Sequence, residues 1–257
     1  MNERVVSVAE AHCIRQDLLP QPPREFQIQH HYLLYASAGA MRLEAGEAAW
    51  SLPPARAALV AAGTPVRLLL KQKMSVCSVL FSTSFAPAPT SALSVFETTP
   101  LARELLLECG RLADEGEPLS EYGRTLFRTL QMISWRLAEK PSRATMPIGR
   151  SSGVVRALAL TEERLSAGIH FEEIAQMTGQ TPRTLARKLS AETGLSWGQI
   201  VQKMRMIRAI EMLAETRAPV TEVALAVGYQ SLSAFNAAFR SFTGETPTAY
   251  RAGFASG

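Results

Sequence analysis

The sequence is poor in cysteine and has no apolar run of membrane length. Its 257 residues include three cysteines, Cys13, Cys77 and Cys109, which stand far apart and form no CxxC pair. This number and spacing exclude a disulfide framework and favour free thiols in a reducing compartment. The N-terminus lacks the apolar core of a secretion signal, and runs such as AALVAAG are far shorter than the roughly 20 residues of a membrane helix. We therefore expect a soluble cytoplasmic protein that has no membrane partner.

The motifs of several enzyme classes are also missing. The sequence contains no GxGxxG, no Walker-type loop and no HExxH helix. His30 and His31 are adjacent, so in one strand their side chains would point to opposite faces. That leaves too few nitrogen ligands for redox iron or catalytic zinc, although Glu25 and Glu44 could add oxygens to a weak metal site. We expect no catalytic residues, no metal site and no cofactor.

Bulk charge is a weak guide to partners, because 27 basic and 23 acidic residues give a net charge of only +4. One segment is locally basic, however. Between residues 179 and 210 six basic residues accompany a single acid, Glu192. Such a surface can attract phosphate groups, and the alternative is an ordinary solvated helix face. The basic residues of this segment are Arg183, Arg187, Lys188, Lys203, Arg205 and Arg208.

The length of the chain suits two domains, and its pattern changes character near residue 95. From residue 25 to residue 82 short apolar runs alternate with turn signals, which predicts a small antiparallel β-barrel. Leucines then recur at helical intervals and predict two helices, the second over residues 119–137. A stretch rich in Pro, Ser, Gly and Arg follows and predicts a linker. The expected division is a barrel domain 1–95, a helical region 96–140, a linker 141–152 and a last domain 153–257.

The last domain repeats itself. The segment FEEIAQMTGQTPRTLARKLSAETG aligns with VTEVALAVGYQSLSAFNAAFRSFTG, with Gly179 matching Gly228 and Gly194 matching Gly244. Each copy predicts a helix, a tight turn at the first glycine, a second helix and a stop at the second glycine, which is the helix-turn-helix plan. Residues 197–213 should form one continuous helix that joins the two copies, because they contain no proline and their single glycine stands near the start.

The second helix of each copy has an apolar face and a polar face. In the first copy Leu185 and Leu189 share one face, and Arg183 and Arg187 fall nearly opposite, where they could bond to bases in a major groove. The second copy combines an aromatic stripe with small outward side chains and one arginine, so we expect it mainly to position the protein. The candidate DNA-binding residues are Arg183, Thr184, Arg187, Lys188, Ser231, Ser233, Asn236 and Arg240.

Residues 153–257 resemble the double helix-turn-helix DNA-binding domain of AraC/XylS-type transcription regulators. The most specific part is the pattern AxxxGYxSxSxFxxxFxxxxGxTPxxYR, which runs from Ala224 to Arg251. The sequence departs from the family at Ala237, where many members carry arginine, and this argues against base reading by the second copy. The resemblance implies a regulator that binds double-stranded DNA, and RNA polymerase if it activates transcription.

The β-rich region resembles, more weakly, the cupin-like effector domain of one AraC-type subgroup, on the residues YLLYASAGAMRL and SLPPARAALVAAGTP. Val66 stands where that subgroup commonly has histidine, so we expect a small-molecule effector bound without a required metal. The effector-binding candidates are His30, Tyr32, Arg42 and Trp50. The alternatives are a hydrogen-bonded core role for an inward histidine, a core role for Trp50, and solvated positions at the barrel rim for Arg56 and Arg67.

Together these patterns predict an α+β multidomain protein: an N-terminal cupin-like antiparallel β-barrel, two following helices, and a C-terminal all-α double helix-turn-helix domain. A transcription regulator accounts for every part. A cupin enzyme accounts only for the barrel, and a helical adaptor for proteins leaves the outward arginines unexplained. The helix over residues 119–137 should also supply a homodimer contact, because Phe127 and Trp135 lie outside its apolar stripe. The alternative is that both faces of this helix are buried within one subunit.

Overall fold

The computed structural model of this chain describes residues 10–46, 48–70, 72–112, 119–142, 144–166, 168 and 170–253. Residues 1–9 of the expected barrel domain, residues 113–118 of the expected helical region and residue 143 of the expected linker lie outside this part. The chain divides into two compact units. The N-terminal unit comprises residues 1–45 and 52–143, and the C-terminal unit comprises residues 46–51 and 144–257. Within the described ranges, no helix combines the length and the apolarity that a bilayer crossing requires.

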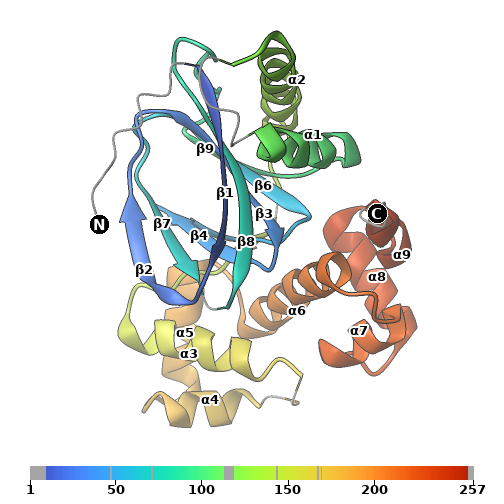
Figure 1. Cartoon of the computed structure of the whole chain (residues 1–257). Coiled ribbons are helices and arrows are strands. Elements are labelled where there is room, and N and C mark those ends of the chain that lie inside the picture. Colours follow the sequence, from blue (N-terminus) through green and yellow to red (C-terminus); the bar gives the residue numbers. More distant parts are fainter. Residues whose placement is uncertain are drawn as a thin grey trace. The chain divides into compact units, whose positions relative to one another are not determined.

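The N-terminal unit is built on antiparallel strands, as the alternation of apolar runs and turn signals predicts (Figure 1). In the described part, five strands form one sheet in the order β1-β8-β3-β6-β9. Their bounds are β1 Ala11–Leu18, β3 His31–Ala38, β6 Arg56–Val60, β8 Met74–Phe81 and β9 Leu93–Glu97. β3 lies at the centre and its first six residues are all buried, which explains why its sequence is a continuous apolar run and does not alternate.

A second group of strands pairs β7 with β2 on one side and with β4 on the other. The bounds of these strands are β2 Gln21–Phe26, β4 Met41–Ala45 and β7 Val66–Leu70. The register between β2 and β7 shifts between Gln21 and Arg24, where Pro22 and Pro23 have no N–H to donate to the ladder. The N-terminal region therefore contains two antiparallel sheets followed by helices, as the sequence predicts.

Two helices, α1 Pro100–Arg111 and α2 Glu121–Ala138, follow the strands near their predicted positions. Each begins at a hydroxyl cap: Thr99 accepts a hydrogen bond from the N–H of Ala102, and Ser120 accepts one from Gly123. α1 packs against β1 and β8, and α2 packs against β6 and β9. The two helices thus cover one face of the five-stranded sheet and complete its core.

The apolar face of α2 differs from the expected one. Phe127 is fully buried, and Trp135 donates a hydrogen bond from Nε1 to the Pro87 carbonyl at 3.0 Å. Phe127 therefore leaves no apolar surface free, whereas Trp135 is half-buried. Tyr122, a member of the predicted stripe, is instead 58% exposed, and Met132 is 64% exposed. The side of α2 that is buried depends on the sheet on which the helix packs. The leucine spacing alone does not reveal this side.

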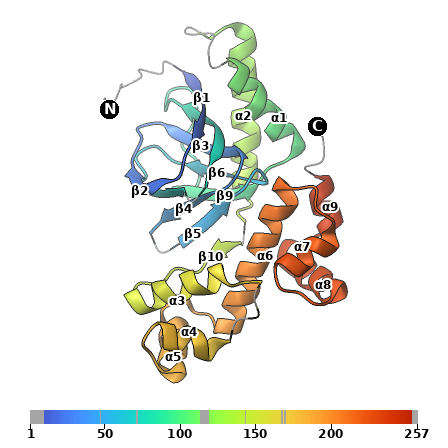
Figure 2. The same ribbon diagram turned by 60° about the horizontal axis from the view of Figure 1, so that its bottom comes forward.

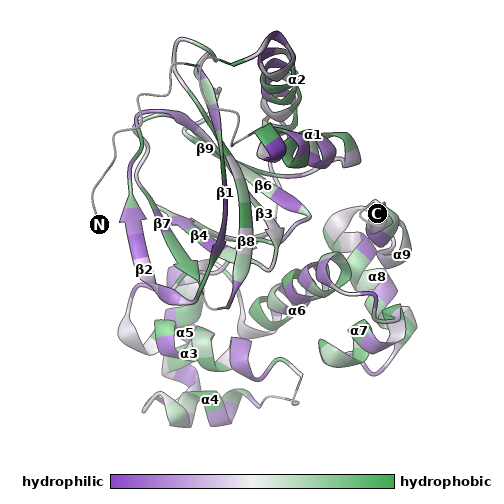
Figure 3. Cartoon of the chain, viewed as in Figure 1, coloured by the Kyte–Doolittle hydropathy of each residue, from purple (hydrophilic) through white to green (hydrophobic). Residues whose placement is uncertain are grey.

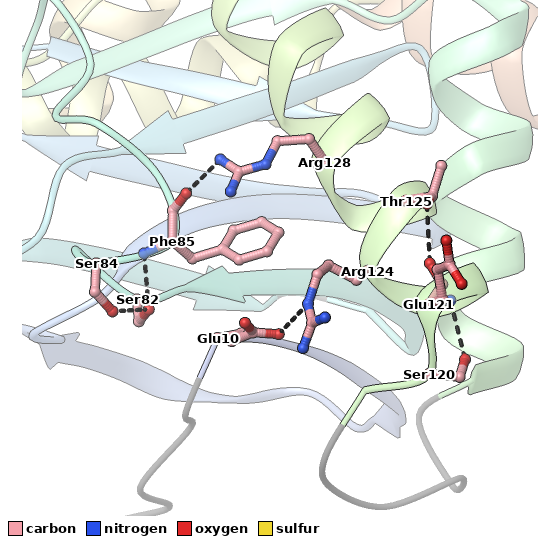
Figure 4. A network of polar contacts seen from close by, with 10 residues as sticks. Glu10, Ser82, Ser84, Phe85, Ser120, Glu121, Arg124, Thr125 and Arg128 are labelled. Carbon is pink, nitrogen blue, oxygen red and sulfur yellow. Dashed lines mark hydrogen bonds and ion pairs between the residues drawn. The ribbon is translucent and has the colours of Figure 1, made fainter.

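Two arginines tie α2 to neighbouring segments of the N-terminal unit (Figure 4). Arg124 Nε donates to Glu10 Oε2 at 2.9 Å. Arg128 Nη1 donates to the Phe85 carbonyl at 2.6 Å, and its guanidinium carbon lies 4.3 Å from the centroid of the Phe85 ring. These charged contacts fix the outer side of α2 while its apolar side packs on the sheet.

The C-terminal unit includes a strand from the β-rich part of the sequence. β5 Ala48–Leu52 pairs antiparallel with β10 Thr145–Met146, which lies in the expected linker (Figure 2). The buried cluster formed there comprises Ala49, Ala144, Met146 and Ile207, with Ile148 and Phe242 packed against it. The expected linker thus contains a short strand, and its residues Ala144 and Met146 are part of a buried cluster.

The rest of the C-terminal unit is helical, with two helix-turn-helix units joined by a long helix. The bounds are α3 Ser152–Glu163, α4 Phe171–Met177, α5 Pro182–Thr193, α6 Trp197–Glu215, α7 Val220–Ala226, α8 Leu232–Thr243 and α9 Pro247–Ala252. The prediction of one continuous helix over residues 197–213 is confirmed by α6. Hydrophilic and hydrophobic residues alternate along it (Figure 3), because α6 packs against helices of both helix-turn-helix units and keeps a polar side.

Candidate nucleic-acid interface

Local signals in the sequence define the first recognition helix, α5. Thr181 is its N-cap and accepts a hydrogen bond from the N–H of Thr184 at 3.2 Å, and Pro182 occupies the first helical turn. Gly194 ends the helix in the left-handed conformation, with φ of 70°. The turn before it has Gly179 at φ +66°, in open space, so backbone conformation alone requires glycine there. The turn and the stop lie where the repeat predicts them.

The two faces of α5 are as different as predicted. Leu185 and Leu189 are buried in the core of the first helix-turn-helix unit, whereas Arg183 and Arg187 are exposed. Thr184 and Lys188 are half-buried on the flanks. Thr181 Oγ1 donates to the Thr184 hydroxyl at 2.9 Å, so Thr184 supports the start of the helix. The structure thus brings two long cationic donors together on the outward side of one rigid helix.

Glu192, the single acidic residue between positions 179 and 210, forms hydrogen bonds with another part of the C-terminal unit. Its carboxylate accepts hydrogen bonds from the N–H of Arg150 at 2.6 Å and of Ser151 at 3.0 Å, just before α3. Burial raises the pKa of Glu192, but the hydrogen bonds from Ser151 and Arg150 outweigh this effect and lower it below its ordinary value. Glu192 therefore anchors the start of α3 while it stays ionised.

The second recognition helix, α8, has fewer long hydrogen-bond donors on its outward face than α5 has. Phe235 and Phe239 are completely buried, and Ser231 caps the helix by accepting from the N–H of Ala234 at 3.4 Å. Ser233, Ala237 and Arg240 are exposed, and Asn236 is half-buried. Gly244 ends the helix at φ 87°. Apart from Arg240, this face carries no long hydrogen-bond donor.

Gly228, the turn glycine of the second unit, is required for two independent reasons. Its φ is +85°, in the region that favours glycine, and a Cβ there would lie 2.7 Å from the carbonyl oxygen of Leu165. The same Cβ would lie 2.7 Å from Nη2 of Arg205. Gly179 has only the first of these constraints, so the two repeats are not equivalent at their turns.

Half of the basic residues between positions 179 and 210 serve the C-terminal unit itself. Lys203 Nζ donates to Thr145 Oγ1 of β10 at 2.9 Å, and burial lowers the pKa of Lys203. The Arg205 guanidinium carbon lies 5.7 Å from the Tyr229 ring centroid, and Arg208 Nη1 pairs with Glu211 at 3.0 Å. The basic surface predicted from charge is therefore smaller than the sequence indicates and centres on α5.

The candidate effector residues lie on different elements of the chain. His30 lies half-buried in a bend, Tyr32 is buried in β3 with its ring centroid 5.9 Å from that of Phe26, and Arg42 of β4 pairs with Glu44 at 3.0 Å. Burial raises the pKa of Tyr32 to about 12. Trp50 lies on β5 opposite Thr145 and belongs to the C-terminal unit.

Two polar residues of the N-terminal unit, His31 and Arg56, are buried. His31 is buried, and its Nδ1 accepts a hydrogen bond from the N–H of Ala62 at 3.1 Å, which is the core role considered as an alternative. Arg56 was expected at a solvated rim, and this is wrong: it is fully buried, and its Nε donates to Glu97 at 2.9 Å. Arg56 and Glu97 are register partners on β6 and β9, a pairing that sequence spacing does not reveal. Arg67 remains exposed and pairs with Glu44 at 3.3 Å.

Comparison with known proteins gives matches to the C-terminal part of the chain and to nearly its whole length. A family model for a helix-turn-helix domain matches residues 174–253. The chain is 26% identical over 256 residues to the HTH-type transcriptional regulator NimR of Escherichia coli, covering 96% of this chain and 89% of NimR. It is 34% identical over 143 residues to VirS of Mycobacterium tuberculosis, also an HTH-type transcriptional regulator, covering 56% of this chain and 38% of VirS.

One solved structure similar to the helical part is a transcriptional regulator from Chromobacterium violaceum, described by its AraC-type DNA-binding domain. The identity is 25% with a TM-score of 0.39, and the match covers 40% of this chain and 93% of that one.

Among the described residues, no group of three His, Cys, Asp or Glu side chains is placed to hold a metal ion.

Proposed function

We propose that this chain, a DNA-binding transcription regulator of the AraC type, reads its operator chiefly through α5 and responds to a small molecule bound by its N-terminal unit. The observation that carries the proposal is the outward pair Arg183 and Arg187 on a capped, rigid helix of a doubled helix-turn-helix domain. Arginine can bond bidentately to guanine in the major groove, and Lys188 on the flank suits a phosphate.

The long helix α6 supports simultaneous binding by both helix-turn-helix units. It has 19 residues and a capping box at Ser196 and Gln199. A helix of that length spans roughly 28 Å, of the order of the 34 Å that separates successive major grooves on one face of DNA. In this arrangement α5 reads bases, whereas Ser231, Ser233, Asn236 and Arg240 of the second unit chiefly contact phosphates and the groove edge.

Strand β5 supports a mechanism by which effector binding changes DNA binding. Most of it lies in the C-terminal unit, yet in the chain it stands between β4 and β6 of the N-terminal unit. Ser51 of β5 donates a hydrogen bond to Glu211 of α6, and Lys203 of α6 donates to Thr145 of the neighbouring strand. An effector that contacts His30, Tyr32 or Arg42 and displaces β4 or β6 would therefore act on the helix that joins the two reading units. Trp50, on β5, would move with this connection.

The other partners follow from this role. A homodimer through the exposed side of α2 would let two copies bind a repeated operator, and RNA polymerase would be a partner if the protein activates transcription. The proposed location is the cytoplasm, and the proposed activity includes no catalysis and no cofactor.

A gel-shift assay with the full chain and the DNA upstream of its own operon tests the DNA-binding role. We expect a salt-sensitive shifted band that unlabelled specific DNA competes away better than unrelated DNA does. The double variant Arg183→Ala, Arg187→Ala should lose this preference while it keeps the helical circular dichroism signal. A helical adaptor for proteins would give no sequence preference with any variant, and this result would exclude the proposal.

A further inference from the structure

The fold brings two of the distant cysteines into contact. Cys13 lies on β1 and Cys77 on β8, which are antiparallel neighbours whose register pairs Cys13 with Val79 and Arg15 with Cys77. The two cysteines are therefore diagonal neighbours on the same face of the sheet, the face covered by α1. Their Sγ atoms are 3.7 Å apart.

A chain of hydrogen bonds connects this pair to α1. Cys77 Sγ donates to the Leu106 carbonyl at 3.1 Å, so the thiol of Cys13 is left as the donor to Cys77 Sγ. The hydrogen bond from Cys13 lowers the pKa of the Cys77 thiol, and Arg15 lowers it further, against the opposing effect of burial. The same interaction, together with burial, raises the pKa of Cys13. The pair is thus unequal: the thiolate forms more readily at Cys77 than at Cys13.

The helix packs closely on this pair. A Cβ at Gly110 of α1 would lie 2.7 Å from Cys77 Sγ and 3.8 Å from Cys13 Sγ, so the helix backbone lies directly on the two sulfurs. Cys109, the third thiol, is buried on α1 beside them, and burial raises its pKa to about 12. Both sulfurs of the pair lie beneath one turn of α1, so access for a reagent requires that turn to open.

We propose that Cys13 and Cys77 are a dithiol redox site that a hydroperoxide converts reversibly into a disulfide. The Cys77 thiolate attacks one peroxide oxygen, the O–O bond breaks, and Cys77 becomes a sulfenic acid while the other oxygen leaves as an alcohol or water after taking up a proton. Cys13 then attacks the sulfenic sulfur, the S–S bond forms, and the hydroxyl leaves as water with the proton of Cys13. The two thiols are oxidised by two electrons and the peroxide is reduced by two.

The reaction requires little movement of the sulfurs but changes what α1 contacts. The sulfurs must approach from 3.7 Å to about 2.05 Å, the length of a disulfide bond. A disulfide has no S–H, so the hydrogen bond from Cys77 to the Leu106 carbonyl is lost. We expect oxidation to loosen α1 on the sheet and leave the strands paired.

Peptide mapping of the full chain after treatment with hydrogen peroxide tests the assignment. The folded protein is oxidised, unfolded in an alkylating agent and digested, before and after reduction with dithiothreitol. We expect one reversible cross-link between the peptides of Cys13 and Cys77, with Cys109 alkylated as a free thiol. The rate should reach a ceiling at high peroxide, because opening of α1 becomes limiting. A cross-link that includes Cys109, or one that forms only in urea, would overturn the proposal.

Variants and amide exchange separate the two parts of the inference. Cys109→Ala should keep the cross-link, whereas Cys13→Ala and Cys77→Ala should lose it. Hydrogen exchange of residues 100–111 should become faster in the oxidised protein, with residues 232–243 of the C-terminal unit as the internal control. Unchanged exchange in α1 of a cross-linked protein would show that the Cys77 hydrogen bond does not hold the helix.

Discussion

Ser51 on β5 donates a hydrogen bond from its hydroxyl to the carboxylate of Glu211 on α6, within the C-terminal unit. Ser51 is 7% exposed and is separated from Glu211 by 160 positions in the sequence. The bond attaches a strand from the β-rich part of the chain to the helix that joins the two helix-turn-helix units.

The first prediction concerns this bond. Ser51→Ala should lower the free energy of unfolding of the C-terminal unit by about 1.5–3 kcal/mol, the range for hydrogen bonds to charged groups. Urea denaturation of the full chain, followed by the helical circular dichroism signal, measures the change. Ser241→Ala is the control, because Ser241 is an exposed serine of the same unit. Equal effects of the two substitutions would mean that the bond contributes nothing.

The two recognition helices should divide the work unequally. Arg187→Ala removes a donor that can supply roughly 1–3 kcal/mol of discrimination at one base pair, so sequence preference should relax in one half of the operator. Arg240→Ala should instead weaken binding to all sequences about equally and reduce the salt dependence by about one phosphate contact. Binding selections on randomised operators distinguish the two outcomes. A half-site that is more sharply specified under α8 would contradict the unequal division.

Substitution of the turn glycines should reveal the difference between the two repeats. Gly179→Ala places an alanine in the left-handed region but in open space, so we expect a loss of about 1–2 kcal/mol. Gly228→Ala adds a clash with the Leu165 carbonyl, a backbone atom that cannot move aside freely, and should cost more. Thermal and urea unfolding of both variants provide the comparison. A smaller loss for Gly228→Ala than for Gly179→Ala would show that the carbonyl yields easily.

His31 should make the stability of the N-terminal unit depend on pH. Burial lowers the pKa of His31 and the neighbouring His30 lowers it further, although a hydrogen bond to the Ala86 backbone opposes them. Above about pH 6.5 the imidazole is neutral in both folded and unfolded chains. As the pH falls below that value the unfolded chain binds the proton first, so the free energy of unfolding should decrease. Denaturation between pH 7.5 and roughly 5 should show this decrease, and it should be smaller in His31→Gln and slightly smaller in His30→Gln, which removes only the lesser of the two lowering effects.

A homodimer through α2 should depend on the exposed apolar residues of that helix. Tyr122 and Met132 are exposed, and a charge at Met132 would have to be buried in such an interface. Met132→Glu should therefore shift the full chain toward the monomer in sedimentation velocity at tens of micromolar, with no loss of helical signal. A wild-type chain that stays monomeric with and without DNA would exclude this dimer.

Local features of the C-terminal unit could be predicted from the sequence. The stops at Gly194 and Gly244 and the uninterrupted helix α6 depend on residues within a few positions of each other. The outward direction of Arg183 and Arg187 follows from 3.6-residue periodicity once Leu185 is known to be buried. Helix geometry converts such spacing directly into position in space, which is why these predictions succeeded.

Only the tertiary structure decided which distant strands lie in contact. The 3.7 Å approach of Cys13 to Cys77, the burial of Arg56 beside Glu97, and the place of β5 in the C-terminal unit all depend on which strands pair and in which register. Alternation along one strand indicates two faces but not the neighbouring strand or the helix that covers each face. The sequence by itself therefore determined the repeated helix-turn-helix units and their outward residues, whereas long-range pairing decided which side chains lie together in the N-terminal unit.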